Sequence, residues 1–119
     1  MNGVHISFYL KTSIIHIFTE TILIIGYPKR ICFLIYADGQ ALLIRAYENR
    51  DLKSHKVPQD VYDGRRSFEI SSWKLCKILA DLHSWDLKHS YRIPGVLMRD
   101  RRAVRFSLAK AEVIGKESS

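Results

Sequence analysis

Two apolar runs that flank Asp38-Gly39 constrain the fold more than any other feature of this sequence. Residues 31–37 and 40–47 are each rich in bulky apolar side chains. The pair Asp-Gly supplies the positive φ angles of a two-residue type I′ turn, whose twist matches that of the strands it joins. We therefore expect an antiparallel hairpin that is buried on both faces, or that places one face in the core and one against a partner.

Side-chain alternation predicts further strands, and helical spacing predicts two helices. The expected strands, in addition to the hairpin, cover residues 4–10, 13–17, 66–71, 88–98 and 103–108. Pro94-Gly95 indicates an edge position or a bulge within its strand. The first helix is expected to begin at Thr19 as N-cap and to end at Gly26 in a left-handed conformation. The second is expected to follow Ser71 or Ser72 as its cap.

These elements predict an α+β fold in one domain that spans residues 1–119. An antiparallel sheet of about six or seven short strands would pack against two helices. The polar segment 48–64 is longer than a typical connection, so we expect it either to carry a short element or to join two halves. The last residues, 115–119, are expected to form a frayed tail.

Two segments, residues 12–46 and 65–108, share the order short strand, short helix, aromatic residue and hairpin. This parallel suggests two related halves. The first unit passes through Ile25-Gly26-Tyr27-Pro28 and the Asp38-Gly39 turn. In that plan it resembles the AbrB and MraZ group of swapped-hairpin transcription regulators. The resemblance implies a regulatory, DNA-binding role and assigns no site residue.

The positive charge of the chain favours polyanionic partners. The chain contains nineteen Lys and Arg residues and twelve Asp and Glu residues, which gives a formal net charge of +7. The expected C-terminal hairpin carries a set of arginines that could share its turn and outer face, and these are the candidate nucleic-acid contacts: Arg92, Arg99, Arg101, Arg102 and Arg105. Guanidinium groups bind phosphates through paired hydrogen bonds, and a two-stranded ribbon fits a major groove. The alternative is a solvated face whose charge Asp100 and Glu69 offset.

Sequence motifs for catalysis or metal binding are not evident. The glycines are scattered singly, the five histidines have no ligand spacing with Cys32 or Cys76, and no nucleophile motif occurs. Both cysteines lie in apolar segments and are expected to be buried, reduced thiols. We therefore expect no enzymatic activity, no cofactor, no metal and no small-molecule substrate. Convergence of His55, His83 or His89 with Asp or Glu in a cleft would favour the alternative of a small enzyme.

The N-terminal apolar region is interrupted by charged residues into runs of about eight residues, too short to span a bilayer. We expect a cytoplasmic protein without a membrane partner. The leading hypothesis is a non-enzymatic binding protein with a nucleic-acid-binding or regulatory role. The alternative is a protein-interaction module that acts as a homodimer. With either function we expect a homodimer if the outer face with Ala41, Leu43 and Tyr47 is uncovered in the monomer.

Overall fold

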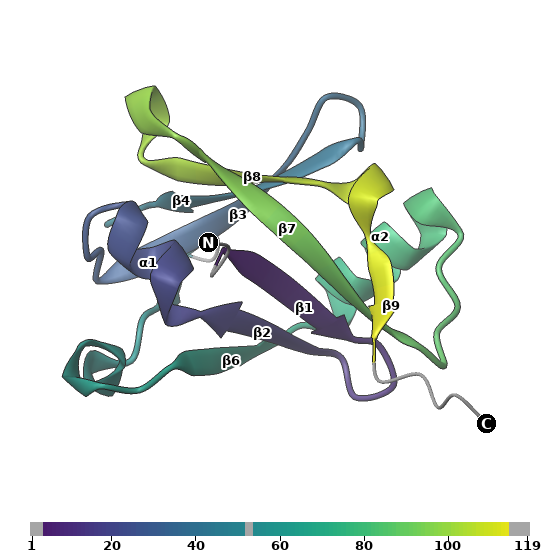
Figure 1. Ribbon diagram of the computed structural model, residues 1–119, viewed down its shortest axis with the longest axis horizontal. Coiled ribbons are helices and arrows are strands. Elements are labelled where there is room, and N and C mark those ends of the chain that lie inside the picture. Colours follow the sequence, from purple (N-terminus) through teal and green to yellow (C-terminus); the bar gives the residue numbers. More distant parts are fainter. Residues whose placement is uncertain (1–3, 52–53, 115–119) are drawn as a thin grey trace.

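Nine strands form one antiparallel sheet in the computed structural model, which describes residues 4–51 and 54–114 without the side chain of Arg101 (Figure 1). The elements in chain order are β1 (His5–Tyr9), β2 (Ile14–Phe18), α1 (Thr19–Ile24), β3 (Arg30–Tyr36), β4 (Ala41–Ala46), β5 (Ser54–Lys56), the 3-10 helix η1 (Gln59–Asp63), β6 (Ser67–Ser71), α2 (Trp73–His83), β7 (Ser90–Met98), η2 (Arg99–Arg101), β8 (Ala103–Ser107), η3 (Leu108–Lys110) and β9 (Glu112–Ile114).

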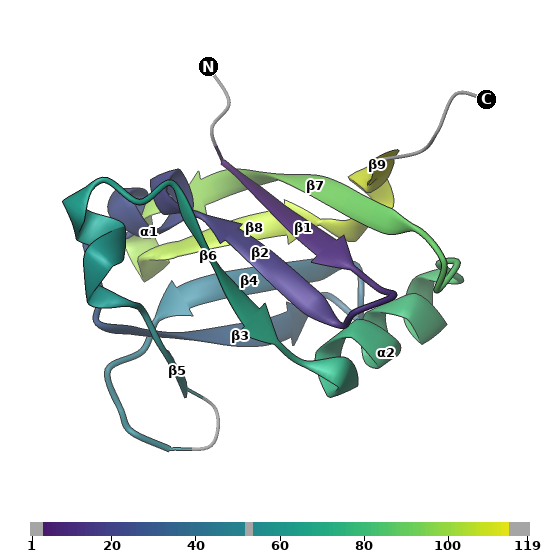
Figure 2. The same ribbon diagram turned by 90° about the horizontal axis from the view of Figure 1, so that it is seen from below.

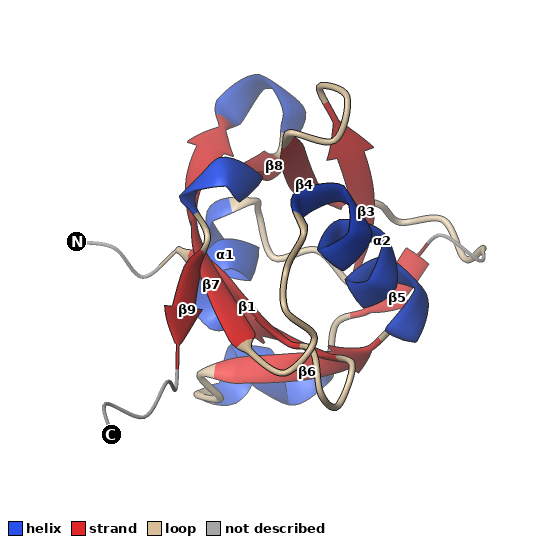
Figure 3. Ribbon diagram, turned by 90° about the vertical axis from the view of Figure 1, so that its right-hand side faces the viewer, coloured by secondary structure: helices blue, strands red, loops and turns tan. Residues whose placement is uncertain are grey.

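The sheet curls into a nearly closed barrel. Its strand order is β5-β3-β4-β8-β7-β1-β2-β6, and β9 pairs with β7. The two α-helices lie at opposite ends of the molecule (Figure 2), and α2 stands in front of the strands when the barrel is seen from that end (Figure 3). None of the described helices is long and apolar enough to cross a membrane.

The expected α+β fold with six or seven strands is therefore wrong, because the molecule is mostly an antiparallel barrel with nine strands. The two helices were expected, but they contain only 6 and 11 residues. Helices of that length cannot cover a sheet of this size, so the sheet buries its apolar face against itself. The two unexpected strands, β5 and β9, have three residues each. Strands this short carry no detectable alternation.

Alternate side chains of the strands fill the barrel. Phe8, Phe68 and Phe106 are fully buried and come from three different strands. Val104, Phe106 and Leu108, at alternate positions of the expected strand 103–108, all point inward, since each is at most 1% exposed. Burial of each large apolar side chain contributes about 1.5–3 kcal/mol, so this interior is the main source of stability.

β7 changes its partner at the predicted irregularity. Residues up to Pro94 pair with β1, and residues from Gly95 onward pair with β8. A Cβ at Gly95 would lie 2.6 Å from side-chain atoms of both Phe106 and Val104. Glycine is required here because β7 bends closely over the core, as its diagonal path in Figure 1 shows.

The predicted hairpin is confirmed. β3 and β4 pair from Ile31↔Ala46 to Tyr36↔Ala41. Asp38 and Gly39 have φ angles of 55° and 87°, and the Gln40 N–H donates to the Ala37 carbonyl at 3.1 Å. Both positive φ angles match those of a type I′ turn. The connection is longer than the expected two residues, because Tyr36↔Ala41 is the last strand pair and Ala37 is left-handed as well, with a φ of 56°.

The helix boundaries follow the predictions in part. The Ser72 hydroxyl caps α2, since it accepts from the Leu75 N–H at 3.2 Å. Gly26 has the expected left-handed φ of 98° after α1. The expected Thr19 cap is wrong: Phe18 is the N-cap residue, and the Thr19 hydroxyl donates to the Arg65 carbonyl at 2.6 Å. The contact with the chain that leads into β6 takes the hydroxyl group that capping would need.

The polar segment 48–64 carries β5 and η1, which agrees with the expectation that it carries a short element of its own. The expected tail, residues 115–119, lies outside the described residues. If β1, β2, β3 and β4 are matched in order with β5, β6, β7 and β8, each neighbouring pair among these eight strands has a counterpart that is also paired. The exception is β1–β2, because its counterpart β5–β6 is unpaired. α1 follows β2 as α2 follows β6. The duplication itself stays a prediction, although this pairing pattern is the one that a duplicated strand-helix-hairpin unit would have.

Candidate anion-binding site

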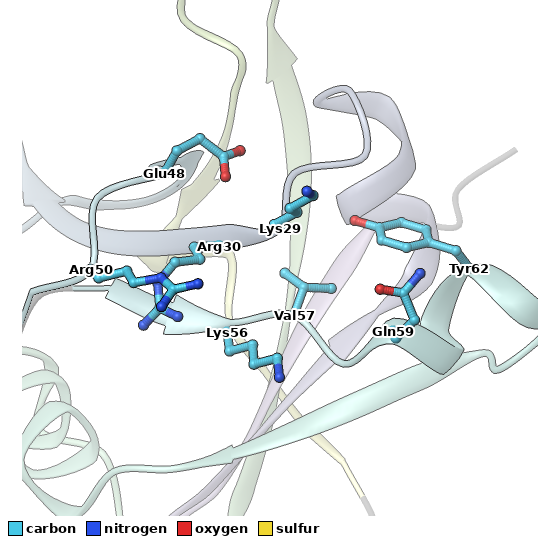
Figure 4. A pocket seen from close by; sticks show the side chains of 8 residues that line it. All are labelled: Lys29, Arg30, Glu48, Arg50, Lys56, Val57, Gln59 and Tyr62. Atoms are coloured by element: carbon cyan, nitrogen blue, oxygen red, sulfur yellow. The ribbon is translucent and has the colours of Figure 1, made fainter.

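A basic hollow of about 240 Å³ lies where β3 begins, beside β5 and η1 (Figure 4). We call it the cationic pocket. Its lining residues are Lys29, Arg30, Glu48, Arg50, Lys56, Val57, Gln59 and Tyr62. Four of these eight side chains are basic and one is acidic. Ligand pockets typically have roughly 300–1,000 Å³, so the cationic pocket fits one charged group of a larger ligand.

The strand register places two of the cations directly opposite each other. β5 pairs with the start of β3, and Arg30 is the partner of Lys56. Both side chains line the cationic pocket. Like charges in directly opposed positions are destabilising, by roughly 0.2–1 kcal/mol for a pair of this kind. An unfavourable local arrangement of this sort is typical of a functional site.

Backbone and side-chain hydrogen bonds hold this arrangement. The Arg30 Nε donates to the Ser54 hydroxyl at 2.7 Å, which ties the guanidinium to β5. The Val57 N–H donates to the Lys29 carbonyl at 2.9 Å and extends the contact beyond the strand pair. The Tyr47 N–H donates to the Arg30 carbonyl at 3.0 Å. The cations therefore project from a fixed backbone.

No carboxylate of the described residues forms an ion pair with these cations. The ion pairs within 4 Å among the described residues join Arg65 to Asp60, Lys77 to Asp81 and His89 to Asp86. Glu48 lines the cationic pocket but forms none of these pairs. In Figure 4 Glu48 and Lys56 lie on opposite sides of the pocket. The pocket therefore has an excess of positive charge that an anion can balance.

Tyr62 closes the side of the pocket that faces η1. Its hydroxyl donates to the Pro28 carbonyl at 2.6 Å. Burial, with smaller contributions from Glu48 and Tyr27, raises the pKa of Tyr62 to about 12. The phenol therefore stays neutral and adds no negative charge to the pocket at physiological pH.

His55 follows Ser54 in β5 and packs edge-on against Phe33, with 5.3 Å between the ring centroids. Burial and the nearby Arg30 charge lower the pKa of His55. Both effects disfavour the charged imidazolium. The positive charge beside β5 therefore comes from lysine and arginine rather than from histidine.

The predicted arginines have separate surroundings. Arg102 donates from Nε to the Ile25 carbonyl at 3.0 Å and from Nη2 to the Gly26 carbonyl at 3.3 Å, so it caps the end of α1. Arg92 lies over Phe18, with its Cζ 5.9 Å from the ring centroid, and its Nε is buried without a hydrogen-bond partner. Arg105 of β8 pairs with Val96 of β7. Val96 lies four residues beyond Arg92, which separates these two positions by about 13 Å along β7.

Arg99 is exposed in η2, and the side chain of Arg101 lies outside the described part of the chain. The structure thus brings together Lys29, Arg30, Arg50 and Lys56 rather than the arginines of the last hairpin. The role of the hairpin arginines in binding nucleic acid stays a prediction. The signal that sequence reasoning missed is the recurrence of basic residues at 29, 30, 50 and 56 around segments that it interpreted as turn and loop.

The histidines named for the enzyme alternative do not meet a carboxylate in the cationic pocket, since none of them lines it. His83 forms a 2.7 Å hydrogen bond with the Gly39 carbonyl, and His89 lies 3.5 Å from the Asp86 carboxylate. His55 lies in β5, in contact with Phe33. Over residues 4–51 and 54–114, no three His, Cys, Asp or Glu side chains are grouped to hold a metal ion. Cys32 and Cys76 are both buried, as expected.

Comparisons with known proteins found no matching family model, no matching curated protein and no matching solved structure.

Proposed function

We propose that this chain is a non-enzymatic binding protein that binds the phosphate groups of a nucleic acid at the cationic pocket. The observation that carries the proposal is the pairing of Arg30 with Lys56 across β3 and β5, next to Lys29 and Arg50. No carboxylate of the described residues lies within 4 Å of these four charges. A regulatory role and a cytoplasmic location, both expected from the sequence, remain part of the proposal.

Phosphate is the anion that suits this set of donors. Arginine presents a planar fork that matches two phosphate oxygens, and lysine adds a compact charge. A single phosphate group carries at most about two negative charges, whereas the pocket holds four cations and one carboxylate. A polymer with repeated phosphates balances this excess better than one isolated ion does. The net charge of +7 attracts the same class of ligand over longer distances.

Binding of labelled oligonucleotides across a salt series tests the proposal. The affinity should fall steeply with salt, because each phosphate contact releases counterions and contributes a slope of about 0.7 for a single strand. The double variant Arg50→Ala/Lys56→Ala should weaken binding and reduce the slope by about 1.4. Both side chains are exposed, so the variant should fold normally.

A matched control removes the same charge elsewhere. Lys74 and Lys88 are exposed and do not line the pocket, so Lys74→Ala/Lys88→Ala should leave the slope close to that of the wild type. An Arg105→Ala variant separates the pocket from the hairpin arginines. Loss of binding in Arg105→Ala but not in the pocket variant, or no binding even at low salt, would overturn the proposal.

A further inference from the structure

We infer that the nucleic acid is single-stranded and that Tyr27 stacks on one of its bases. The inference rests on the proposed function and names the ligand class of the same site. Its starting point is an aromatic ring that the fold leaves in solvent. Tyr27 is 62% exposed, although it immediately follows the buried residues of α1 and the turn at Gly26.

The backbone holds Tyr27 in a conformation that bulky residues rarely adopt. Its φ is 57°, directly after Gly26 with a φ of 98°. The Tyr27 N–H donates to the Ile22 carbonyl at 3.4 Å, so the left-handed geometry is part of the end of α1. A left-handed conformation costs a non-glycine residue roughly 1–2 kcal/mol. Strain of this kind concentrates at functional sites, and here it presents an aromatic face to solvent.

The exposed ring borders the cationic pocket. A second hollow of about 350 Å³ is lined by Leu23, Tyr27, Val61, Arg65 and Arg66, and it shares Tyr62 with the pocket. The rings of Tyr27 and Tyr62 are in contact, with 5.3 Å between centroids and 33° between planes. Lys29 follows Tyr27 by two residues, so their Cα atoms are at most about 7 Å apart. A base on Tyr27 and a phosphate at Lys29 can therefore belong to neighbouring parts of one strand.

The charge around the two hollows suits a polyanion. Six basic side chains and two acidic ones, Glu48 and Glu20, line them, which gives an excess of four positive charges. Asp60 offsets one of the six, because it lies 3.1 Å from Arg65. An aromatic ring at the edge of a basic groove is the arrangement by which proteins bind single strands without sequence preference.

A duplex cannot use this ring. Its bases are already paired and stacked, so it offers Tyr27 no free base face. Duplex DNA would contact only the cations, whereas a single strand would contact both the cations and the ring. The structure therefore favours a single strand over a duplex of the same length.

The test compares three ligands of equal length: a mixed-sequence single strand, its duplex, and an abasic strand that keeps the phosphates but has no bases. Each is titrated by fluorescence anisotropy at low salt, with DNA and RNA versions of the single strand. The proteins are the wild type, Tyr27→Ala, Tyr27→Phe and Trp73→Ala. Trp73 is 68% exposed on α2 and lines neither hollow, so it is the matched aromatic control.

Tyr27→Ala should weaken binding of the base-bearing single strand about 5- to 150-fold, the equivalent of one lost stacking contact. Binding of the abasic strand and the duplex should be unchanged by that substitution. Tyr27→Phe and Trp73→Ala should bind like the wild type. The single strands of DNA and RNA should bind with similar affinity, because the bases of both offer a face for stacking.

Two outcomes distinguish the two proposals. If the wild type binds the abasic strand as tightly as the base-bearing one, the stacking inference is overturned and phosphate binding at the cationic pocket stands. If it binds none of the three ligands at low salt, the proposed function itself is overturned. Equal weakening of all ligands by Tyr27→Ala would also overturn the inference, because stacking cannot affect an abasic strand.

Discussion

Tyr62 connects the cationic pocket to the core of the barrel. Its hydroxyl bonds to the Pro28 carbonyl, and its ring supports Tyr27. Val61, the residue before it, is 1% exposed and belongs to the core. Tyr62 is therefore a positioning residue that fixes η1 against the start of β3. Two properties of Tyr62 are specific to tyrosine. The hydrogen bond stabilises the folded state, whereas the raised pKa lowers the stability of the folded state as the pH rises above 10.

Tyr62→Phe removes both of these properties. Below pH 10 the wild type should be more stable by about 0.5–1.5 kcal/mol, the net value of one hydrogen bond. The pKa of Tyr62 is raised from 10.0 to about 12, so between pH 10 and 12 the unfolded chain loses this proton more readily than the folded one. The stability advantage of the wild type should shrink across that window. Urea unfolding at pH 8 and pH 11 measures it, and a constant difference would contradict the expectation.

β5 is the element on which the pocket depends, and it is short. It contributes three residues at the open edge of the barrel and pairs only with β3. Ser54 is its buried anchor, bonded to Arg30 Nε and to the Asp51 carbonyl. Lys56 is exposed and opposes Arg30. The fold therefore accepts a repulsive pair at an edge where few other contacts stabilise the strand.

Lys56→Gln should stabilise the protein, because it removes one member of this like-charge pair. We expect an increase of about 0.2–1 kcal/mol in the free energy of unfolding at low salt, and a smaller increase at high salt because salt screens exposed charges. Urea unfolding at two salt concentrations measures both values. Lys88→Gln is the control, and it should change stability less. A destabilised Lys56→Gln variant would show that Lys56 is favourably paired instead.

The barrel buries most of the surface on which the expected homodimer was predicted to form. Of the three residues whose exposure would have required a partner, Ala41 and Leu43 are 0% and 3% exposed within the monomer, and Tyr47 is half-buried. Exposed apolar side chains remain at the end of β3, where Leu34, Ile35 and Tyr36 are 37–41% exposed. Dimerisation stays a prediction, and this end of β3 is the surface on which it now depends.

Light scattering over a concentration series should give twice the monomer mass at high protein concentration. Ile35→Lys should return the protein to a monomer, because it places a charge in the apolar contact. Leu87→Lys changes a comparably exposed apolar residue outside β3 and should leave the dimer intact. A monomer at every concentration would exclude self-association as the function of this surface.

Local chemistry made several features of this chain predictable. The Asp38-Gly39 turn, the Ser72 cap, the left-handed Gly26 and the shared direction of Val104 and Phe106 depend on residues within a few positions of each other. Propensity, capping and alternation act over that range. The predicted Thr19 cap is wrong because the hydroxyl has a distant partner: it donates to the carbonyl of Arg65, 46 residues away.

The barrel and its pocket depend on pairings that leave no local signal. β2 pairs with β6 and β3 pairs with β5, and the second partner of each pair lies more than 20 residues further along the chain. Ser54-His55-Lys56 is too short and too polar to predict a strand from its own residues. The long-range pairing of β3 with β5 brings Lys56 opposite Arg30, and the tertiary structure places Tyr62 beside Tyr27. The sequence alone therefore establishes a basic, hairpin-rich chain, whereas its strongest anion-binding candidate exists only because distant strands meet in space.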